Sequence, residues 1–426
     1  MREPAQRLRI LSIFLNNRSA FLVLIVAIAG VKLTVSALAP ASYELETLPL
    51  SGFYASPWVI LENGIFEAWR TITGSNLTFA VWSTTIPPMM NGDLRILSLL
   101  LRLPAFLCDV LVSVALYFTG YQITGSRESG RLTSLVWFMN PYTLFAAELL
   151  AVPDVLVALL TLISMLCLLR QKPVLSAILL FCAIGLKLYP IILLPVLLIY
   201  VHKYFAEKLR YELCVTICGL LGVVAYLGWV LQGAPLTVSD FINYTPVSQP
   251  LSVLGVFSSS IPLSVAMAAL AVLYFLALYF AKDSSSSGLI VHLITVVLLT
   301  YFVFSAFYPQ YFIWGLPFMT LDVSLFNRRR WPLFVALLLS VFGTWFITSA
   351  GLATPSGFSL LLFPLEGPSL PAYSIAIQQF FQSEVTRFIL ASLMEDVMYA
   401  FALVYVIAVI SRWNWNRLVR DYEAAR

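Results

Sequence analysis

The chain alternates long apolar runs with short polar segments along most of its length. Many of these runs approach the ~20 residues with which an α-helix crosses ~30 Å of hydrocarbon. Taken in order, the runs predict about 12 membrane-spanning helices and an all-α, polytopic membrane fold. The first predicted span covers residues 19–38, and the last passes through Glu395-Asp396.

The charged residues between the spans predict the orientation of the chain. Basic segments recur at alternate connections, and Arg328-Arg329-Arg330 is the most basic of them. The positive-inside rule places such segments, and with them both termini, in the cytoplasm. The three longer connections, 39–96, 233–260 and 351–386, are then external. Residues 57–72 of the first have the pattern of an amphipathic helix on the membrane surface.

The spans fall into two predicted regions. Residues 1–315 form a transmembrane core that includes the long external loop 39–96. Residues 316–426 form a C-terminal transmembrane region with the external loop 351–386 and a cytoplasmic tail.

Composition supports a membrane protein and excludes several other classes. The chain is 60% hydrophobic and 11% charged, with a mean hydropathy of +0.91, which no soluble domain approaches. The net charge of +4 resides mainly in short connections and gives no indication of nucleic-acid binding. Five Cys residues without metal-ligand spacing and two His residues predict neither a metal site nor a cofactor. No cleavable signal is evident, so the first run is expected to be a retained span.

The predicted topology gathers unusual polar residues on or near the external side. Lys187 is the clearest case, because it lies near the centre of the hydrophobic run 173–201, which is too long for one span. Two short helices meeting at Lys187 and broken by Pro190 would form a hairpin with a cation at its tip. Such a cation indicates an anion site or a lysine that reaches the membrane interface. The external set is Glu44, Glu46, Asp93, Glu148, Asp154, Lys187, Gln310 and Arg387.

External acidic residues near a buried cation are typical of two kinds of membrane protein. One is an enzyme that acts on a lipid-linked substrate at the outer surface, with a carboxylate base and cations that hold a phosphate. The other is a transporter with a midplane site on broken helices. The acids are not concentrated at mid-depth and no clear internal repeat is evident, which favours the enzyme.

Four segments resemble, in order, the motifs of one membrane enzyme class. They are Arg102-Leu103-Pro104 with Asp109, Asn140-Pro141 with Pro153-Asp154, Gly185 to Pro190, and Tyr308 to Trp314. The chain is similar in these segments to GT-C class glycosyltransferases that use polyprenyl- or dolichyl-phosphate sugars. Archaeal and bacterial polyprenol-phosphate-mannose mannosyltransferases and the catalytic subunit of GPI mannosyltransferase I are the most similar groups. Tyr308 stands where the family has His.

The resemblance implies inverting transfer of a sugar, with mannose favoured, from a polyprenyl-phosphate donor to a lipid-linked or glycan acceptor at the external or lumenal face. Glu44 or Glu46, in place of the family's Asp after the first span, would be the general base. Lys187 and Arg102 would neutralise the leaving phosphate without a metal or cofactor. The rest of the implied substrate-binding set is Asp93, Asp109, Asp154, Tyr189, Gln310 and Tyr311.

The same resemblance implies a multi-pass protein of an archaeal or bacterial plasma membrane, or of the endoplasmic reticulum. Its partners would be the sugar donor, the acceptor and membrane lipids. Two alternatives of other classes stay open: a transporter of a lipid or solute, and a non-catalytic GT-C-like membrane subunit. The subunit alternative predicts that Glu44 and Glu46 are dispensable.

Each candidate residue also has a purely structural interpretation. Asp109 would pair with Lys32 or Arg102 in order to remain buried inside its span. Asp154 would cap the helix that follows it. Gln310 would form hydrogen bonds between helices.

Overall fold

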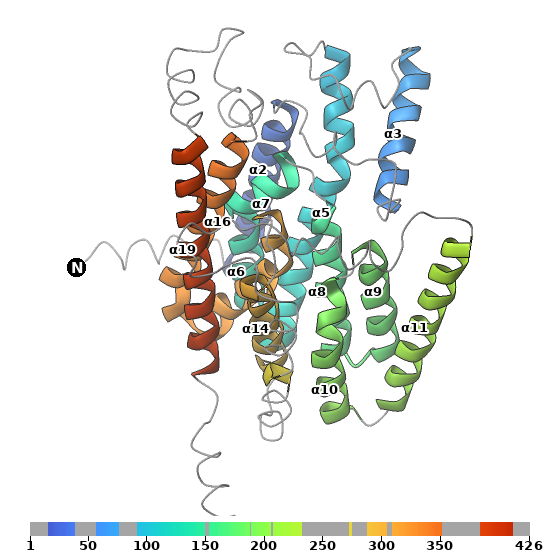
Figure 1. The fold of residues 1–426 in the computed structure, drawn as a ribbon, viewed down its shortest axis with the longest axis vertical. Coiled ribbons are helices and arrows are strands. Elements are labelled where there is room, and N and C mark those ends of the chain that lie inside the picture. The colour runs from blue at the N-terminus through green and yellow to red at the C-terminus, as the bar shows by residue number, and fades with distance from the viewer. Residues whose placement is uncertain are drawn as a thin grey trace, which may run out of the picture.

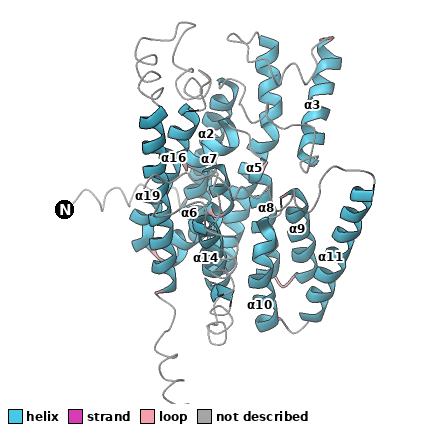
Figure 2. Ribbon diagram, viewed as in Figure 1, coloured by secondary structure: helices cyan, strands magenta, loops and turns pink. Residues whose placement is uncertain are grey.

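The fold is described from a computed structural model, which defines residues 16–38, 57–75, 92–149, 153–187, 189–205, 208–231, 272–274, 288–304, 309–351 and 384–411. In this part of the chain the regular structure is helical throughout, without strands (Figures 1 and 2). The all-α prediction is therefore confirmed here. The predicted loop 233–260, most of the eighth predicted span, the tail beyond Ser411, Glu44 and Glu46 lie outside the described residues.

The first third of the chain contains two long helices and one helical segment that is interrupted. Helices cover the residues of the predicted first and second spans, and the second helix begins earlier than expected, at Gly92, and continues through Pro104. The predicted break at Asn140-Pro141 is also present, and a π-helix follows it. The elements are α2 (Arg18–Leu38), α3 (Pro57–Thr73), α5 (Gly92–Thr124), α6 (Arg127–Phe138), α7 (Pro141–Thr143) and η2 (Leu144–Leu149).

The middle of the chain contains the predicted hairpin at Lys187. One arm rises to Leu186, the backbone is extended at Lys187 (φ −151°, ψ 141°), and a 3-10 turn leads into the second arm. Pro195 lies in the first turn of that arm, where its missing N–H costs no helical hydrogen bond. The elements are α8 (Asp154–Leu169), α9 (Pro173–Leu186), η3 (Tyr189–Leu193), α10 (Leu194–Tyr204) and α11 (Lys208–Leu231).

The C-terminal part alternates long helices with short irregular turns. The predicted tenth span is not one α-helix, because it is divided into 3-10, α and π segments. The elements are α14 (Gly288–Phe304), η4 (Pro309–Trp314), α15 (Leu316–Leu321), η5 (Asp322–Phe326), η6 (Arg328–Arg330), α16 (Trp331–Gly351) and α19 (Glu384–Ile410).

The long helices run roughly parallel to one common direction (Figure 1). Helices α16 and α19 lie together on one side, α9 and α11 lie on the other, and α5 and α8 lie between them. Helix α3 runs beside the upper part of α5 and contacts it. A helix is thus present where residues 57–72 were expected to form one, and its predicted place on the membrane surface stays a prediction.

Small and hydroxyl side chains bring neighbouring helices close together. Ser113 Oγ of α5 lies 2.7 Å from Ser134 Oγ of α6, and Ser164 Oγ of α8 lies 2.9 Å from Ser176 Oγ of α9. Such contacts satisfy hydroxyl groups that are buried between apolar helices. Gly130 allows an even closer approach of α6 to α5, because a Cβ there would lie 2.6 Å from the Tyr117 carbonyl oxygen.

Two of the described helices contain apolar stretches long enough to cross a membrane, at Arg18–Val35 and Leu99–Thr124. The first is buried over only 11% of its stretch, and the second over 56%. Other described helices, including α8, α9 and α14, are apolar but shorter.

Candidate functional site

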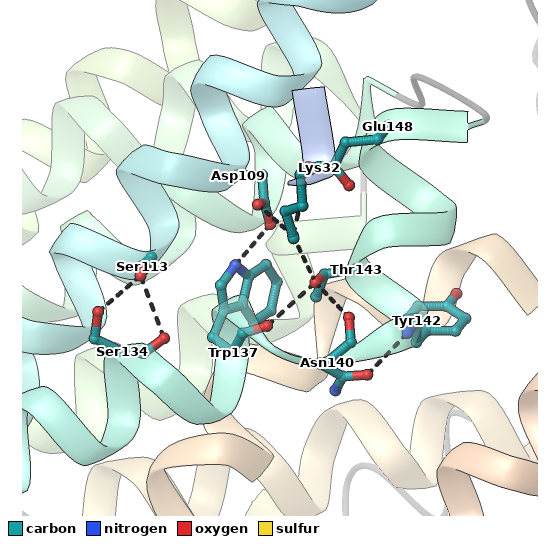
Figure 3. Close-up of polar contacts among 9 residues, drawn as sticks. All are labelled: Lys32, Asp109, Ser113, Ser134, Trp137, Asn140, Tyr142, Thr143 and Glu148. Carbon is teal, nitrogen blue, oxygen red and sulfur yellow. Dashed lines mark hydrogen bonds and ion pairs between the residues drawn. The ribbon is translucent and has the colours of Figure 1, made fainter. Parts of the chain in front are cut away.

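The first polar cluster surrounds Asp109 in the middle of α5. Lys32 of α2 places its Nζ 2.6 Å from Asp109 Oδ2, and the Trp137 indole donates a 2.8 Å hydrogen bond to Asp109 Oδ1. All three side chains point toward one another between α2, α5 and α6 (Figure 3). Asp109 is fully buried and the Lys32 side chain is 4% exposed. Both oxygens of this carboxylate are therefore engaged inside the bundle.

The break after α6 supplies the other groups around Lys32. Pro141 has no N–H, and the Asn140 side chain accepts a 2.9 Å hydrogen bond from the backbone N–H of Tyr142. Thr143 Oγ1 lies within hydrogen-bond distance of the carbonyl oxygens of Trp137 and Asn140. The Lys32 ammonium donates to the same hydroxyl at 3.1 Å (Figure 3). The break at Asn140-Pro141 thus becomes part of the Lys32 site.

A second carboxylate adjoins this cluster. Glu148, on the π-helix η2, places Oε1 3.4 Å from Lys32 Nζ, and its side chain is fully buried. The Lys32 ammonium also lies 4.7 Å from the centre of the Phe138 ring. A buried ammonium is stabilised by such contacts because it has lost its water. Lys32 is thereby fixed in place by α2, α5 and the α6–η2 passage together.

The second polar cluster surrounds Asp154 at the start of α8. Lys187 Nζ lies 2.7 Å from Asp154 Oδ2, and the Trp314 indole donates a 2.5 Å hydrogen bond to Asp154 Oδ1. The Asp154 side chain is 2% exposed, and the Lys187 side chain is 14% exposed. This arrangement of Lys, Asp and Trp has the same chemistry as the Asp109 cluster.

Aromatic rings form one wall of the second cluster. Tyr189 stacks on Trp314 with 3.6 Å between ring centres and 6° between planes, and Tyr311 stacks on Trp314 at 4.4 Å and 16°. The Lys187 ammonium lies 4.9 Å from the centre of the Tyr311 ring. Cation–π attraction adds to the ion pair where water is partly excluded.

Local structure explains why Asp154 can serve this role. It is the first residue of α8, and no side-chain cap hydrogen bond forms at that end. The partial positive charge of a helix N-terminus favours a carboxylate there. The capping alternative is thus not observed, since both oxygens of Asp154 instead contact Lys187 and Trp314.

A third buried carboxylate fastens the C-terminal helices. Arg330 donates hydrogen bonds of 2.6 and 2.7 Å to the two oxygens of Asp322, and the Tyr405 hydroxyl donates one of 2.6 Å to Oδ2. His292 Nε2 lies 3.0 Å from Oδ1. Arg330 also donates to the Ala408 carbonyl at 3.0 Å, so this cluster ties α14, η5 and η6 to α19.

The structure brings some of the predicted site residues together and separates others. Asp154, Lys187, Tyr189 and Tyr311 meet in the second cluster, whereas Asp109 belongs to the first. These contacts do not test a role in substrate binding or catalysis, and the predicted roles of all the site residues stay predictions. Arg102 is fully buried in α5, Asp93 and Gln310 lie in α5 and η4 with side chains outside the description, and Glu44 and Glu46 lie outside the described residues.

Sequence reasoning gave no role to the two tryptophans that complete the clusters. Trp314 ends the last resembling motif, and that position was its only signal in the sequence. Trp137 carries no such signal. Among the described residues no group of three His, Cys, Asp or Glu side chains could hold a metal ion.

Comparison with known proteins gives one family match. Residues 70–248 match the family described as GPI transamidase subunit PIG-U. A search of curated proteins found no match. The matched stretch contains Asp109, Asp154 and Lys187, while Lys32 precedes it and Trp314 follows it.

This match corrects the expected activity. The resemblance to a GT-C-like membrane family is supported, but the matched family is a transamidase subunit and not a mannosyltransferase catalytic subunit. The prediction of a polyprenyl-phosphate-sugar-dependent mannosyltransferase is therefore wrong. The finding that overturns it is the family match, because short motifs shared with a GT-C-like fold do not specify the reaction. The substrate-site roles of Asp109 and Asp154 stay predictions, and in the structure each carboxylate is engaged by a lysine and a tryptophan of the chain itself.

Proposed function

We propose that this chain is a non-catalytic, GT-C-like membrane subunit of a GPI transamidase. The match of residues 70–248 to the family of that description carries the proposal. The match includes the helices from α5 to α11, which contribute residues to both Lys–Asp–Trp clusters. In this role the chain would support the assembly and perform no bond-making step of its own.

The state of the buried acids favours a structural role. A carboxylate that acts as a general base needs an oxygen that can reach the substrate proton. Asp109 and Asp154 each use one oxygen for a lysine and the other for an indole N–H, and both are almost completely buried. Buried ion pairs of this kind hold helices in register and are costly to open.

Membrane insertion in several spans is part of the proposal. The composition of the chain and the two long apolar helices support it, and the shorter apolar helices would complete the bundle. Of the two locations that the sequence left open, the endoplasmic reticulum fits the matched family. The partners would be the other subunits of the complex.

The decisive experiment measures GPI attachment to a secreted reporter protein in cells depleted of this chain. We expect attachment to fall on depletion and to return with the wild-type chain. The variants Glu44→Gln and Glu46→Gln should restore it equally well, because a non-catalytic subunit needs no carboxylate base. Transamidase activity should also co-purify with the wild-type chain when membranes are solubilised in mild detergent.

Two outcomes would contradict the proposal. Normal attachment in depleted cells would remove the chain from the transamidase, and loss of a transported lipid or solute in the same cells would then favour the transporter alternative. Loss of attachment with Glu44→Gln or Glu46→Gln at normal protein level would contradict the non-catalytic role.

A further inference from the structure

One face of α5 is apolar and exposed over much of the helix. Large side chains on this face follow one another at intervals of three or four residues, the spacing that aligns positions along a helix. Each of them is between 40% and 50% exposed. We call these residues the α5 face: Leu107, Leu111, Val114, Phe118 and Tyr121. This part of α5 therefore presents an apolar surface to its surroundings.

The turn between α8 and α9 lies at the C-terminal end of the α5 face. The Arg170 guanidinium lies 5.4 Å from the centre of the Phe118 ring. The Gln122 side-chain amide of α5 donates a long hydrogen bond of 3.5 Å to the Leu169 carbonyl oxygen at the end of α8. These contacts fasten the end of α8 to the last part of α5, so the apolar face ends beside a cation.

The backbone of this turn determines where its two cations emerge. The Gln171 N–H donates to the Leu168 carbonyl oxygen at 2.9 Å. The Lys172 N–H donates to the Cys167 carbonyl oxygen at 2.8 Å. Gln171 has φ 58°, in the left-handed region, so the turn ends α8 in a Schellman arrangement. Arg170 and Lys172, which we call the basic turn, therefore leave the chain on either side of a hydrogen-bonded backbone.

The basic turn has no carboxylate partner in the described part of the chain. Arg170 and Lys172 are both exposed, and neither side chain forms an ion pair or donates a hydrogen bond to a described residue. The buried cations Lys32, Lys187 and Arg330 instead each contact an aspartate. Exposed cations that face no carboxylate can form charge-assisted hydrogen bonds with an external anion, and a guanidinium fits phosphate oxygens especially well.

The length of the α5 face fits one leaflet of a membrane. Leu107 and Phe118 are separated along α5 by a distance of roughly 16 Å, at the rise of an α-helix. Half of a hydrocarbon core is ~15 Å thick. An acyl chain that runs along the face from Phe118 would thus end near the middle of the bilayer at Leu107, with its headgroup beside the basic turn.

From these observations we propose that the α5 face and the basic turn bind a phospholipid whose headgroup carries a net negative charge. Arg170 and Lys172 contact the headgroup phosphate, and one acyl chain packs along the α5 face. A zwitterionic phospholipid binds more weakly, because it brings no net negative charge to the two cations. The inference rests on the membrane insertion that is part of the proposed function, and it does not depend on transamidase activity.

Photo-cross-linking of the full chain in lipid nanodiscs tests this site. The nanodiscs contain phosphatidylcholine and a small fraction of one probe, either phosphatidylinositol or phosphatidylcholine, with a diazirine at the same acyl position. Trypsin releases residues 103–127 as one peptide, because Arg102 and Arg127 flank the α5 face. In the wild-type protein the phosphatidylinositol probe should label this peptide about tenfold more than the phosphatidylcholine probe, or by a larger factor.

Arg170→Gln and Lys172→Gln should each lower labelling by the phosphatidylinositol probe about fivefold, because each cation contributes to the attraction of an anionic lipid. Labelling by the phosphatidylcholine probe should not change, which also shows that the variants remain folded and inserted. Arg170→Lys should retain most of the labelling, since it keeps the charge. Arg329→Gln is the matched control and should have no effect, because it removes an exposed cation immediately before α16, on the other side of the bundle from α9 (Figure 1).

Equal labelling of residues 103–127 by the two probes in the wild-type protein would overturn the proposal. An equal loss in Arg329→Gln and Arg170→Gln would do so too, because net charge and not the basic turn would then attract the lipid. Absence of labelling by both probes would contradict the membrane insertion of α5 and this site together. Loss of the transamidase role in the depletion experiment would leave the headgroup preference intact, so the site and the proposed function can fail separately.

Discussion

The Lys32 ammonium lies 2.6 Å from the Asp109 carboxylate and joins α2 to α5 across 77 residues of sequence. The second cluster repeats this relationship with Lys187, Asp154 and Trp314. Lys32 precedes the family-matched stretch 70–248, and Trp314 follows it. Each aspartate therefore fastens the matched helices to a part of the chain outside the match.

Asp109→Asn should destabilise the fold strongly. The substitution removes the negative charge that faces Lys32, whose side chain is 4% exposed. Removal of one partner from a buried ion pair leaves an uncompensated charge and costs about 3–5 kcal/mol. Denaturant titration in detergent micelles, followed by circular dichroism, should show this loss.

Asp154→Asn is the matched comparison, and it should lower the free energy of unfolding by less than Asp109→Asn does. Its lysine, Lys187, is 14% exposed and can reach water, and an Asn side chain can still accept from Trp314. Equal losses of unfolding free energy in the two variants would contradict the conclusion that Lys187 can reach water while Lys32 cannot.

Replacement of either tryptophan by phenylalanine should also lower the free energy of unfolding, but by less than Asp109→Asn does. Trp137→Phe and Trp314→Phe keep an aromatic ring but remove the N–H that Asp109 or Asp154 accepts. A lost hydrogen bond to a buried charged group costs about 1.5–3 kcal/mol. The same denaturant titration measures it, and Trp331→Phe, which alters a tryptophan outside both clusters, serves as the control. An effect no larger than that of Trp331→Phe would show that the two indoles do not stabilise the carboxylates.

The hairpin could be predicted because its signal is local. A hydrophobic run too long for one span, with one charge near its centre and a proline after it, leaves few other arrangements. Lys187 indeed lies where α9 ends. The pairing of Asp109 with Lys32 was foreseen as a structural alternative, because a charge inside a span requires a partner.

The contacts of the aspartates could not be predicted, because they involve distant residues. A motif fixes the position of Asp154 in the chain, but its chemistry depends on Lys187 and Trp314, the latter 160 residues away. The same motif would fit a carboxylate that faces a substrate. Hydrophobicity likewise does not distinguish an α-helix from the 3-10 segment η4 or the π segment η5. For this reason the tenth span was predicted as one continuous helix, although the structure divides it.

Arg330→Lys should loosen the C-terminal helix although the charge is retained. Arg330 contacts both oxygens of Asp322 through Nη1 while Nη2 donates to the Ala408 carbonyl of α19, and the single ammonium of a lysine cannot reproduce both contacts in this geometry. We expect a loss of about 1–3 kcal/mol in the free energy of unfolding. Arg329→Lys, at an exposed neighbouring position, should leave it unchanged. Similar free energies of unfolding for the two variants in denaturant titration would show that the simultaneous contact of Arg330 with Asp322 and Ala408 does not stabilise the fold.

The crossing of α5 and α6 provides the last test, because it depends on the absence of a side chain. In Gly130→Ala the new Cβ would lie 2.6 Å from the Tyr117 carbonyl oxygen and 3.1 Å from its ring, so α6 must shift away from α5. Overpacking of this kind costs about 1–3 kcal/mol. The shift would also disturb the Ser113–Ser134 contact between the same helices.

Gly185→Ala is the control for this crossing. Its Cβ would meet no atom within 4 Å, and alanine favours a helix over glycine by up to about 1 kcal/mol, so the variant should be neutral or slightly stabilising. Denaturant titration of both variants in the same micelles should place Gly130→Ala below the wild type and Gly185→Ala at or above it. If Gly130→Ala is as stable as the wild type, α5 and α6 do not approach as closely as described, and the Trp137–Asp109 contact would lose the packing that positions it.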